Sequence, residues 1–185
     1  MQLSELEMMQ TVLKNAECIY DLAAINRALD RMAHGITEKL QHHNPIILCV
    51  MTGALIPLGH LVTRFNFPLE IDYIHATRYR GTNRGGDLHW LVEPRKNLKN
   101  RHVLIVDDIM DGGLTLAAII DYCKQVHAKE IYSAVMISKD RKRETGVNCE
   151  PDFVGLHAPD QYLFGFGLDY KEYWRNLPGI YAVRE

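Results

Sequence analysis

The residues best suited to chemistry stand together in the middle of the chain, directly after a short apolar run. Val103–Val106 leads into Asp107, Asp108 and Asp111, and residues 112–115 then read Gly-Gly-Leu-Thr before an apolar helical pattern begins. Two glycines let the backbone turn with its N–H groups pointing inward, and the start of a helix adds partial positive charge. This segment predicts a phosphate site that needs no lysine, with the threonine hydroxyl as a further donor.

The acidic side chains indicate what lies beside the phosphate. Asp107 and Asp108 follow the apolar run directly, so they suit hydrogen bonds from sugar hydroxyls or from water on a divalent cation. Three carboxylates would repel a phosphate or pyrophosphate group unless a cation offset their charge. The sequence therefore predicts Mg²⁺ at this site.

A purely structural interpretation of the same segment competes with this one. Acids in a turn often only end a strand and cap the next helix, a role that Asp111 would fill here. Neither the GxxxxGK[ST] pattern of a P-loop nor the GxGxxG fingerprint of dinucleotide-binding proteins is present. We favour the functional interpretation because acids, glycines and a threonine occur together between a strand and a helix.

Alternating strand and helix patterns must position this segment. Asp21 is a suitable cap for a helix whose apolar residues recur at helical spacing from Leu22 to Leu40. Buried strands are predicted at residues 46–51, 103–106 and 131–137, and helical patterns run through Leu61 and over 116–126. This alternation predicts an α/β fold with a parallel sheet, helices on both faces, and ligands at the carboxyl ends of the strands.

A glycine-rich segment separates two further strand patterns. Residues 69–80 and 88–93 alternate apolar with polar side chains, as half-buried strands do. Between them, residues 80–86 read Arg-Gly-Thr-Asn-Arg-Gly-Gly. We expect a hairpin whose tip is a flexible lid.

Composition limits the classes of protein to which the chain can belong. With 185 residues, 47% hydrophobic and 24% charged, it suits one folded domain. The formal net charge of -2 supplies no overall basic field for nucleic acid, and the apolar run at 45–51 is far shorter than the roughly 20 residues that cross a bilayer. Four scattered cysteines without a CxxC pair favour free thiols in a reducing cytoplasm.

Residues 103–115 resemble the ribose-phosphate motif of type I phosphoribosyltransferases, and the chain resembles bacterial hypoxanthine-guanine phosphoribosyltransferases nearly from end to end. Four more segments support the resemblance in order and spacing: MTGA at 51–54, YIHATRYR at 73–80, SKD at 138–140 and YLFGFGLDYKEYWR at 162–175. The resemblance implies one α/β phosphoribosyltransferase domain over residues 1–185, with its core at about 35–155 and a small hood from about 1–20 and 156–185.

The resemblance also implies the activity. It indicates a purine-salvage enzyme that transfers the 5-phosphoribosyl group of 5-phosphoribosyl 1-pyrophosphate to hypoxanthine or guanine, giving IMP or GMP and pyrophosphate. The implied cofactor is Mg²⁺. We expect a cytoplasmic homo-oligomer, a dimer or a tetramer, with no nucleic-acid or membrane partner.

Individual positions carry over from the family to this chain. Asp107 and Asp108 match the acidic pair at the ribose hydroxyls and the metal, and Asp169 matches a further metal ligand. The loop that holds the 5-phosphate matches Asp111, Gly112, Gly113, Leu114 and Thr115. Asp111 also matches the proposed general base at purine N7, where a carboxylate suits the proton lost as the bond to the anomeric carbon forms.

The predicted pyrophosphate contacts are Thr52, Gly53 and Arg175. Thr52 stands where the family often has lysine, so backbone N–H groups would bind pyrophosphate without that charge. The family's non-proline cis peptide would fall between Met51 and Thr52. Leu114 also departs from several relatives, which matters little if the loop binds through its backbone.

The predicted base contacts come from three places in the chain. Lys139 matches the donor to the purine 6-oxo group, Tyr162 the ring that stacks on the base, and Leu163 a backbone contact to the base edge. Tyr79 matches the lid tyrosine that covers the reaction centre. Without the resemblance, Lys139 would be interpreted as a surface lysine, and Tyr162 and Leu163 as core residues.

Three other functions remain alternatives. An adenine or xanthine transferase would keep the phosphate loop and change the base pocket, and Lys139 argues against adenine. An RNA-binding regulator on the same fold would need a basic face. A phosphatase-like hydrolase would use Asp111 as nucleophile, although its usual aspartate would end the strand rather than open the loop.

Overall fold

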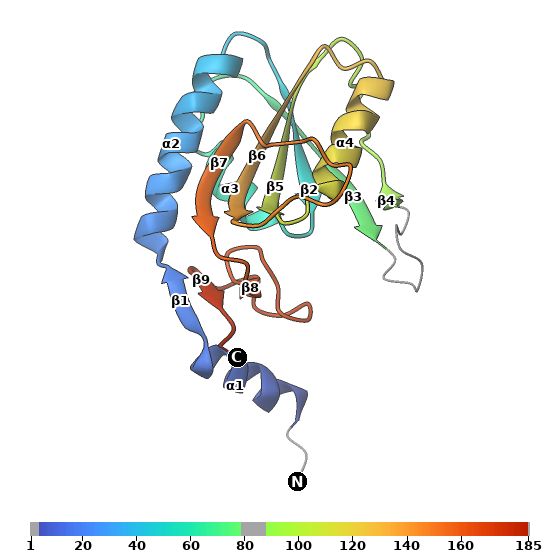
Figure 1. Cartoon of the computed structure of the whole chain (residues 1–185). Helices are drawn as coiled ribbons and strands as arrows, with labels where there is room; N and C mark the ends of the chain where they lie inside the picture. The colour runs from blue at the N-terminus through green and yellow to red at the C-terminus, as the bar shows by residue number, and fades with distance from the viewer. Residues whose placement is uncertain (1–3, 79–87, 185) are drawn as a thin grey trace.

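The computed structural model describes residues 4–78 and 88–184. Its larger sheet has six strands in the order β4-β3-β2-β5-β6-β7 (Figure 1). These strands are β2 (Ile46–Met51), β3 (Glu70–Arg78), β4 (Leu88–Val92), β5 (His102–Met110), β6 (Glu130–Lys139) and β7 (Phe153–Ala158). The α/β fold predicted from the sequence is confirmed.

One pair of strands in this sheet is antiparallel, as expected of the hairpin predicted from residues 69–80 and 88–93. The pairs β2–β3, β2–β5, β5–β6 and β6–β7 are parallel, whereas β3–β4 is antiparallel. The reason is the short connection, because a parallel pair needs a crossover of a dozen or more residues and β4 follows β3 too closely. The tip of the predicted lid, residues 79–87, lies outside the described residues.

The helices cover both faces of the sheet. They are α2 (Leu22–Leu40), α3 (Leu55–Val62) and α4 (Leu114–Gln125). The connections β2 to β3 and β5 to β6 run in opposite directions along the sheet, so right-handed crossovers place α3 and α4 on opposite faces. Helix α2 packs against α3 and β7, and Figure 1 shows it on the other side of the sheet from α4.

Local sequence explains why these elements form where they do. Asp21 is the N-cap of α2, since its Oδ1 accepts a hydrogen bond from Ala24 N at 2.7 Å. The buried stripe of α2 consists of Ile25, Ala28, Leu29, Met32, Ala33, Ile36 and Leu40. Strands β2, β5 and β6 are buried along most of their length, which explains their largely apolar sequence.

A second, smaller sheet joins segments from both ends of the chain. Its order is β1-β9-β8, with β1 (Glu17–Tyr20), β8 (Leu163–Phe164) and β9 (Ile180–Ala182), and helix α1 (Glu5–Asn15) precedes it. Figure 1 shows this small sheet beyond the carboxyl ends of the large one. The carboxyl edge of the large sheet is therefore the edge that faces the C-terminal segment.

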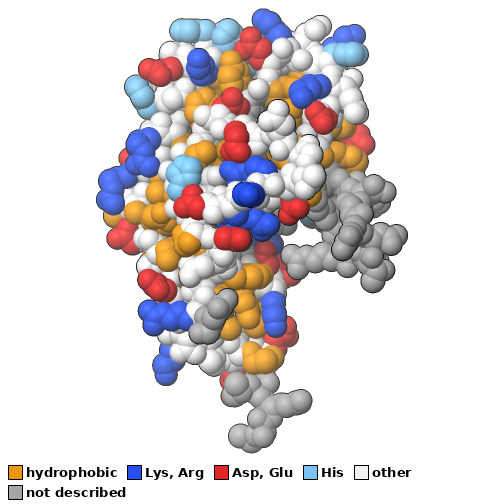
Figure 2. Space-filling model, in the orientation of Figure 1, with side chains coloured by type: hydrophobic (Ala, Val, Ile, Leu, Met, Phe, Trp, Pro, Cys, Tyr) orange, Lys and Arg blue, Asp and Glu red, His pale blue; other side chains and the backbone are white. Residues whose placement is uncertain are grey.

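Surface charge is mixed on the face drawn in Figure 2, where Lys and Arg side chains are interspersed with Asp and Glu. None of the helices within residues 4–78 and 88–184 has the length and apolar character needed to cross a bilayer.

Candidate active site

A cavity of about 540 Å³ opens at the carboxyl ends of β2 and β5. Strand order reverses direction between these two strands, and open α/β sheets bind ligands at such a switch point. The predicted phosphate, ribose, pyrophosphate and metal residues that line it are Thr52, Gly53, Asp107, Asp108, Asp111, Gly112, Gly113, Leu114, Thr115, Asp169 and Arg175. The sequence expectations thus meet in one place, although the role of each residue stays a prediction.

Strand β5 is longer than the apolar run that predicted it. It continues to Met110, because Ile109 and Met110 pair with Ile137 and Ser138 of β6. Asp107 and Asp108 therefore lie within the strand, as its sixth and seventh residues. The pairing with β6 fixes the direction in which both acids project.

The turn after β5 leaves backbone donors available. Gly113 is the N-cap of α4, with φ of +84° and no side-chain cap, so the alternative in which Asp111 only caps the helix is wrong. The first amide of the helix with a main-chain acceptor is that of Ala117, which donates to Gly113 O at 3.0 Å. Gly112, Gly113, Leu114 and Thr115 line the cavity, so the N-terminus of α4 lies beside it, an arrangement that favours an anion.

Asp107 and Asp108 are held close together with little solvent. Asp107 is only 7% exposed, and its Oδ1 accepts a hydrogen bond from Asp108 N at 2.9 Å. Burial raises the pKa of Asp107 well above its usual range, and the charge of Asp108 adds to this; burial also raises the pKa of Asp108. A cation beside the two carboxylates would stabilise their charged forms and so lower both pKa values.

The carboxylates fit Mg²⁺ as part of a shared site. Oxygen donors suit this ion, which is often bound by one or two carboxylates together with substrate phosphates and water. Among residues 4–78 and 88–184, no three acidic, histidine or cysteine side chains converge closely enough to hold a metal by themselves. Asp107 and Asp108 would therefore supply part of the coordination, and the phosphate groups of a substrate the rest.

The loop after β2 packs tightly between two other segments. Its Met51–Thr52 peptide is cis, as the resemblance implies. A Cβ on Gly53 would stand 1.9 Å from Asp108 Oδ2, and a Cβ on Gly167 would stand 2.2 Å from Gly53 O. Glycine is needed at both positions because the loop touches the end of β5 on one side and the C-terminal segment on the other.

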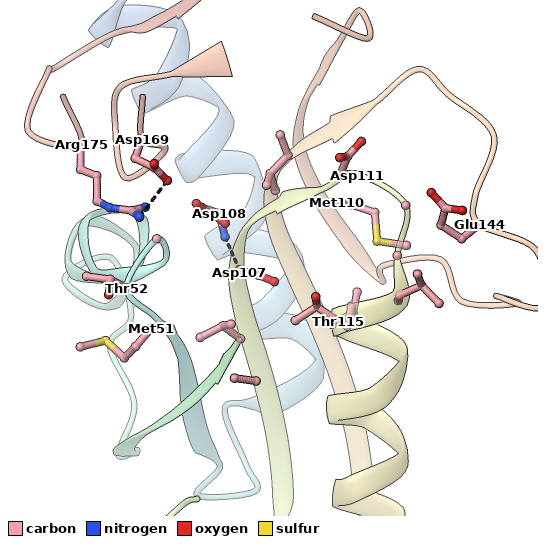
Figure 3. A pocket seen from close by; sticks show the side chains of 18 residues that line it. Met51, Thr52, Asp107, Asp108, Met110, Asp111, Thr115, Glu144, Asp169 and Arg175 are labelled. Atoms are coloured by element: carbon pink, nitrogen blue, oxygen red, sulfur yellow. Dashed lines mark hydrogen bonds and ion pairs between the residues drawn. The ribbon is translucent and has the colours of Figure 1, made fainter. Parts of the chain in front are cut away.

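Asp169 and Arg175 form the wall opposite the phosphate turn. Arg175 Nη2 lies 2.8 Å from Asp169 Oδ1, and Arg175 Nη1 donates to Gly167 O at 2.8 Å. Figure 3 shows this pair on one side of Asp107 and Asp108, with Asp111 on the other. A metal at Asp169 would compete with this ion pair, whereas the guanidinium is free to bind an anion with its remaining donors.

The predicted base contacts lie next to the cavity rather than in its lining. Lys139 Nζ is 3.7 Å from Asp111 Oδ1 and 3.4 Å from Asp160 Oδ1, and its side chain is only 13% exposed, so it is not a surface lysine. Tyr162 is 50% exposed and its ring packs edge-on against Tyr170, while Leu163 is buried. Of these residues, Lys139 is the one in contact with Asp111.

Several charged residues near the site carried no signal in the sequence. Arg141 Nη1 donates to Asp111 Oδ1 at 3.0 Å, Arg143 Nη1 donates to Asp111 O at 3.2 Å, and Glu144 lines the cavity. In the sequence, the segment 141–144 is typical of a charged surface loop, and its place four residues after the strand predicted at 131–137 is the one signal for the carboxyl edge. Tyr79 lies outside the described residues, so its predicted role at the lid has no structural counterpart here.

Comparison with known proteins agrees with this geometry. A family model described as Phosphoribosyl transferase domain matches residues 15–172. The hypoxanthine-guanine-xanthine phosphoribosyltransferase of Tritrichomonas foetus is 30% identical over 167 residues, which cover 90% of this chain and 91% of that protein. The hypoxanthine-guanine phosphoribosyltransferase of Aquifex aeolicus is 32% identical over 163 residues, covering 87% and 90%.

Solved structures show the same similarity. A hypoxanthine phosphoribosyltransferase from Staphylococcus aureus aligns with a TM-score of 0.87 at 25% identity, over 98% of this chain and 97% of that one. These findings confirm the resemblance seen in the sequence. The chain belongs to the phosphoribosyltransferase family, and the relatives that it matches along most of their length are named hypoxanthine-guanine and hypoxanthine-guanine-xanthine phosphoribosyltransferases.

Proposed function

We propose that this chain transfers the 5-phosphoribosyl group of 5-phosphoribosyl 1-pyrophosphate to hypoxanthine or guanine, which yields IMP or GMP and pyrophosphate. The observation that carries the proposal is one cavity in which the phosphate turn, the buried Asp107 with its neighbour Asp108, and the Asp169–Arg175 pair face one another. Such a cavity offers a site for the 5-phosphate, the ribose and the pyrophosphate in a row. The names of the relatives support the choice of a 6-oxopurine as acceptor.

The position of Asp111 supports a role as acceptor of the proton that the purine loses. It opens the phosphate turn, and its carboxylate is half exposed toward the cavity, with Lys139 and Arg141 close by. As the bond between the purine nitrogen and the anomeric carbon forms, the proton moves to the carboxylate and the bond to pyrophosphate breaks. Lys139 and Arg141 must loosen their contacts with this carboxylate before it can accept the proton.

Lys139 supports selection of a 6-oxopurine. Its ammonium group is a donor without acceptor capacity, so it pairs with a carbonyl oxygen and not with the amino group of adenine. It lies beside Asp111, and this proximity supports a donor for the 6-oxo group next to an acceptor for the proton at N7. Tyr162 offers an exposed ring for stacking, and Leu163 a backbone contact.

Mg²⁺ is the proposed cofactor, held by Asp107 and Asp108 together with substrate oxygens, with Asp169 as a further ligand. When bound, the ion would offset the charge that develops on the departing pyrophosphate. Chelation with EDTA should abolish transfer, and added Mg²⁺ should restore it. Transfer that persists in EDTA would contradict the cofactor assignment while leaving the transferase assignment intact.

The test of the function is a panel of hypoxanthine, guanine, xanthine and adenine with the activated ribose donor and Mg²⁺, read as nucleotide formed. IMP and GMP formation without AMP formation is the expected result. Preference for xanthine or adenine would support the alternative base pockets. Hydrolysis of phosphate esters without nucleotide formation would favour the hydrolase, and RNA binding without either reaction would favour the regulator.

We also propose that the chain acts as a homo-oligomer, a dimer or a tetramer, in the cytoplasm. Large apolar side chains gather around α3 and β3, where Leu55 is 53%, Ile71 50% and Tyr73 40% exposed and all three line one groove. Cys18, Cys49, Cys123 and Cys149 are free thiols, which suits a reducing compartment. Light scattering measures the subunit number directly, and loss of association in Ile71→Lys would identify the face.

The small sheet with its flanking segments acts as the hood in this proposal, on a core of about residues 35–155. Gly167 packs tightly against Gly53, so the C-terminal segment, which belongs to the hood, touches the pyrophosphate loop of the core at this point.

A further inference from the structure

Arg143 makes an unusual set of contacts just outside the cavity. Its Nη1 donates to two backbone carbonyl oxygens, Asp111 O at 3.2 Å and Lys139 O at 3.3 Å. Its Nη2 donates to Ser138 Oγ at 3.0 Å. One guanidinium group therefore binds the main chain of both residues that the proposed function places at the purine.

The guanidinium is itself held in a fixed orientation. Glu150 accepts two hydrogen bonds from it, from Arg143 Nε at 2.9 Å and from Nη2 at 2.8 Å. This two-point arrangement restricts rotation of the planar group as well as its position. The Arg143 side chain is only 16% exposed, whereas that of Glu150 is 67% exposed, so the bonds to Asp111 O, Lys139 O and Ser138 Oγ are the ones that are partly shielded from water.

The position of Arg143 in the fold explains what these contacts do. The last residue pair of the β5–β6 ladder is Met110 with Ser138. The next residues along the two strands are Asp111 and Lys139, which no longer pair with each other through the ladder. The guanidinium joins the strands at the point where their own hydrogen bonds stop.

We propose that Arg143, oriented by Glu150, is a positioning residue that fixes the distance between Asp111 and Lys139. It does not line the cavity, so it acts through the two residues whose carbonyls it binds. The inference rests on the proposed function, since Asp111 and Lys139 must act on the same purine for their separation to matter. Because both side chains must fit one rigid ring system, a small shift of either strand end disturbs proton acceptance and 6-oxo recognition together.

The experiment compares Arg143→Gln, Arg143→Lys, Glu150→Gln and the double variant with the wild-type enzyme. Arg64→Gln is the matched control, because the Arg64 side chain is similarly shielded, with 21% exposed, and binds Asp30, Asn26 and a backbone carbonyl away from the cavity. Steady-state kinetics give kcat and the KM of each substrate, and thermal melting gives stability.

Arg143→Gln should lower kcat with hypoxanthine about 10- to 100-fold, as a misplacement of about 1 Å can do. The KM of the ribose donor should change by less than about twofold, since the amides of the phosphate turn remain. Arg143→Lys should recover part of the loss, Glu150→Gln should show a smaller loss of the same kind, and the double variant should be no worse than Arg143→Gln alone. Arg64→Gln should lower the melting temperature without a change in kcat or KM.

Two results separate the possible failures. A wild-type chain that forms no nucleotide overturns the proposed function, and this inference with it. An active wild type whose Arg143→Lys and Glu150→Gln variants lose only thermal stability, with unchanged kcat and KM, overturns the positioning role alone. These two variants keep the test decisive if Arg143→Gln does not fold.

Discussion

Gly53 and Asp108 lie so close together that a Cβ on the glycine would stand 1.9 Å from the carboxylate oxygen Oδ2. The first residue belongs to the loop after β2 and the second to β5, so this contact closes the floor of the cavity across the switch point of the sheet. Any side chain at Gly53 must displace an acid that the proposed function assigns to the ribose and the metal.

Gly53→Ala should therefore lower kcat/KM for the ribose donor by at least about 10-fold, because the displaced Asp108 carboxylate no longer lies where its ligand binds. Gly59→Ala is the matched control, since a Cβ there meets nothing within 4 Å and the residue lies inside α3. This control should gain about 0.5–1 kcal/mol of stability and keep wild-type kinetics. If both variants keep the wild-type kcat/KM for the ribose donor, the position of the Asp108 carboxylate does not affect donor use, which contradicts its proposed role.

Asp111→Asn should reduce turnover with hypoxanthine by about 10²- to 10⁴-fold, because an amide cannot accept the purine proton as a carboxylate does. Binding of the ribose donor, measured by calorimetry, should be largely retained. Asp121→Asn is a suitable control, since Asp121 pairs with Lys124 at 3.0 Å on the exposed face of α4. Unchanged turnover in Asp111→Asn would remove this residue as the base.

Lys139→Ala should weaken the use of 6-oxopurines selectively. Loss of one charge-assisted hydrogen bond typically costs about 1.5–3 kcal/mol, which corresponds to a loss in kcat/KM for hypoxanthine and guanine of about 10- to 100-fold. Any residual activity with adenine should not fall in parallel. If every purine loses the same factor, Lys139 acts on the fold of the site or on Asp111, from which it lies 3.7 Å away, and not on base choice.

Glu70→Gln gives a test of pH-dependent stability away from the cavity. Glu70 accepts hydrogen bonds from Lys96 at 2.6 Å and Arg101 at 2.7 Å, and these bonds lower its pKa from the usual 4.5. A lowered pKa in the folded state stabilises the protein above the unfolded pKa, and this contribution is lost as the pH falls through the folded pKa.

The melting temperature of Glu70→Gln should accordingly lie below that of the wild type at neutral pH, and the difference should shrink as the pH falls below about 4.5. Transferase activity at neutral pH should stay at the wild-type level. A difference in melting temperature that does not depend on pH would indicate lost packing rather than lost charge pairing.

Five of the six strands of the large sheet could be predicted from the sequence because their signals are local, whereas β7 was not predicted. Continuous apolar runs predicted β2, β5 and β6, and Asp21 predicted the start of α2. The small sheet could not be predicted in this way. Its pairing of Glu17 with Ala182 joins residues from opposite ends of the chain, and its strands are only two to four residues long.

The candidate site likewise contains residues that the sequence could predict and residues that it could not. Asp107 to Thr115 form one contiguous segment between a strand and a helix, so residue types alone indicated a phosphate turn. Arg141 and Arg143 owe their positions to where β6 ends relative to β5, and nothing in the order Asp-Arg-Lys-Arg-Glu at 140–144 marks which arginine turns inward. Their contacts with Asp111 required the folded chain.

The placement of β9 between β1 and β8 has a consequence for synthesis of the protein on the ribosome. The phosphate turn can form once β5 and α4 have emerged, but the segment that carries Asp169 and Arg175 is anchored by β8 and β9 on either side of it. A nascent chain that stops before Ile180 would lack β9, and the cavity wall that carries Asp169 and Arg175 would have no anchor on that side. The cavity can therefore be completed only after β9 has been synthesised.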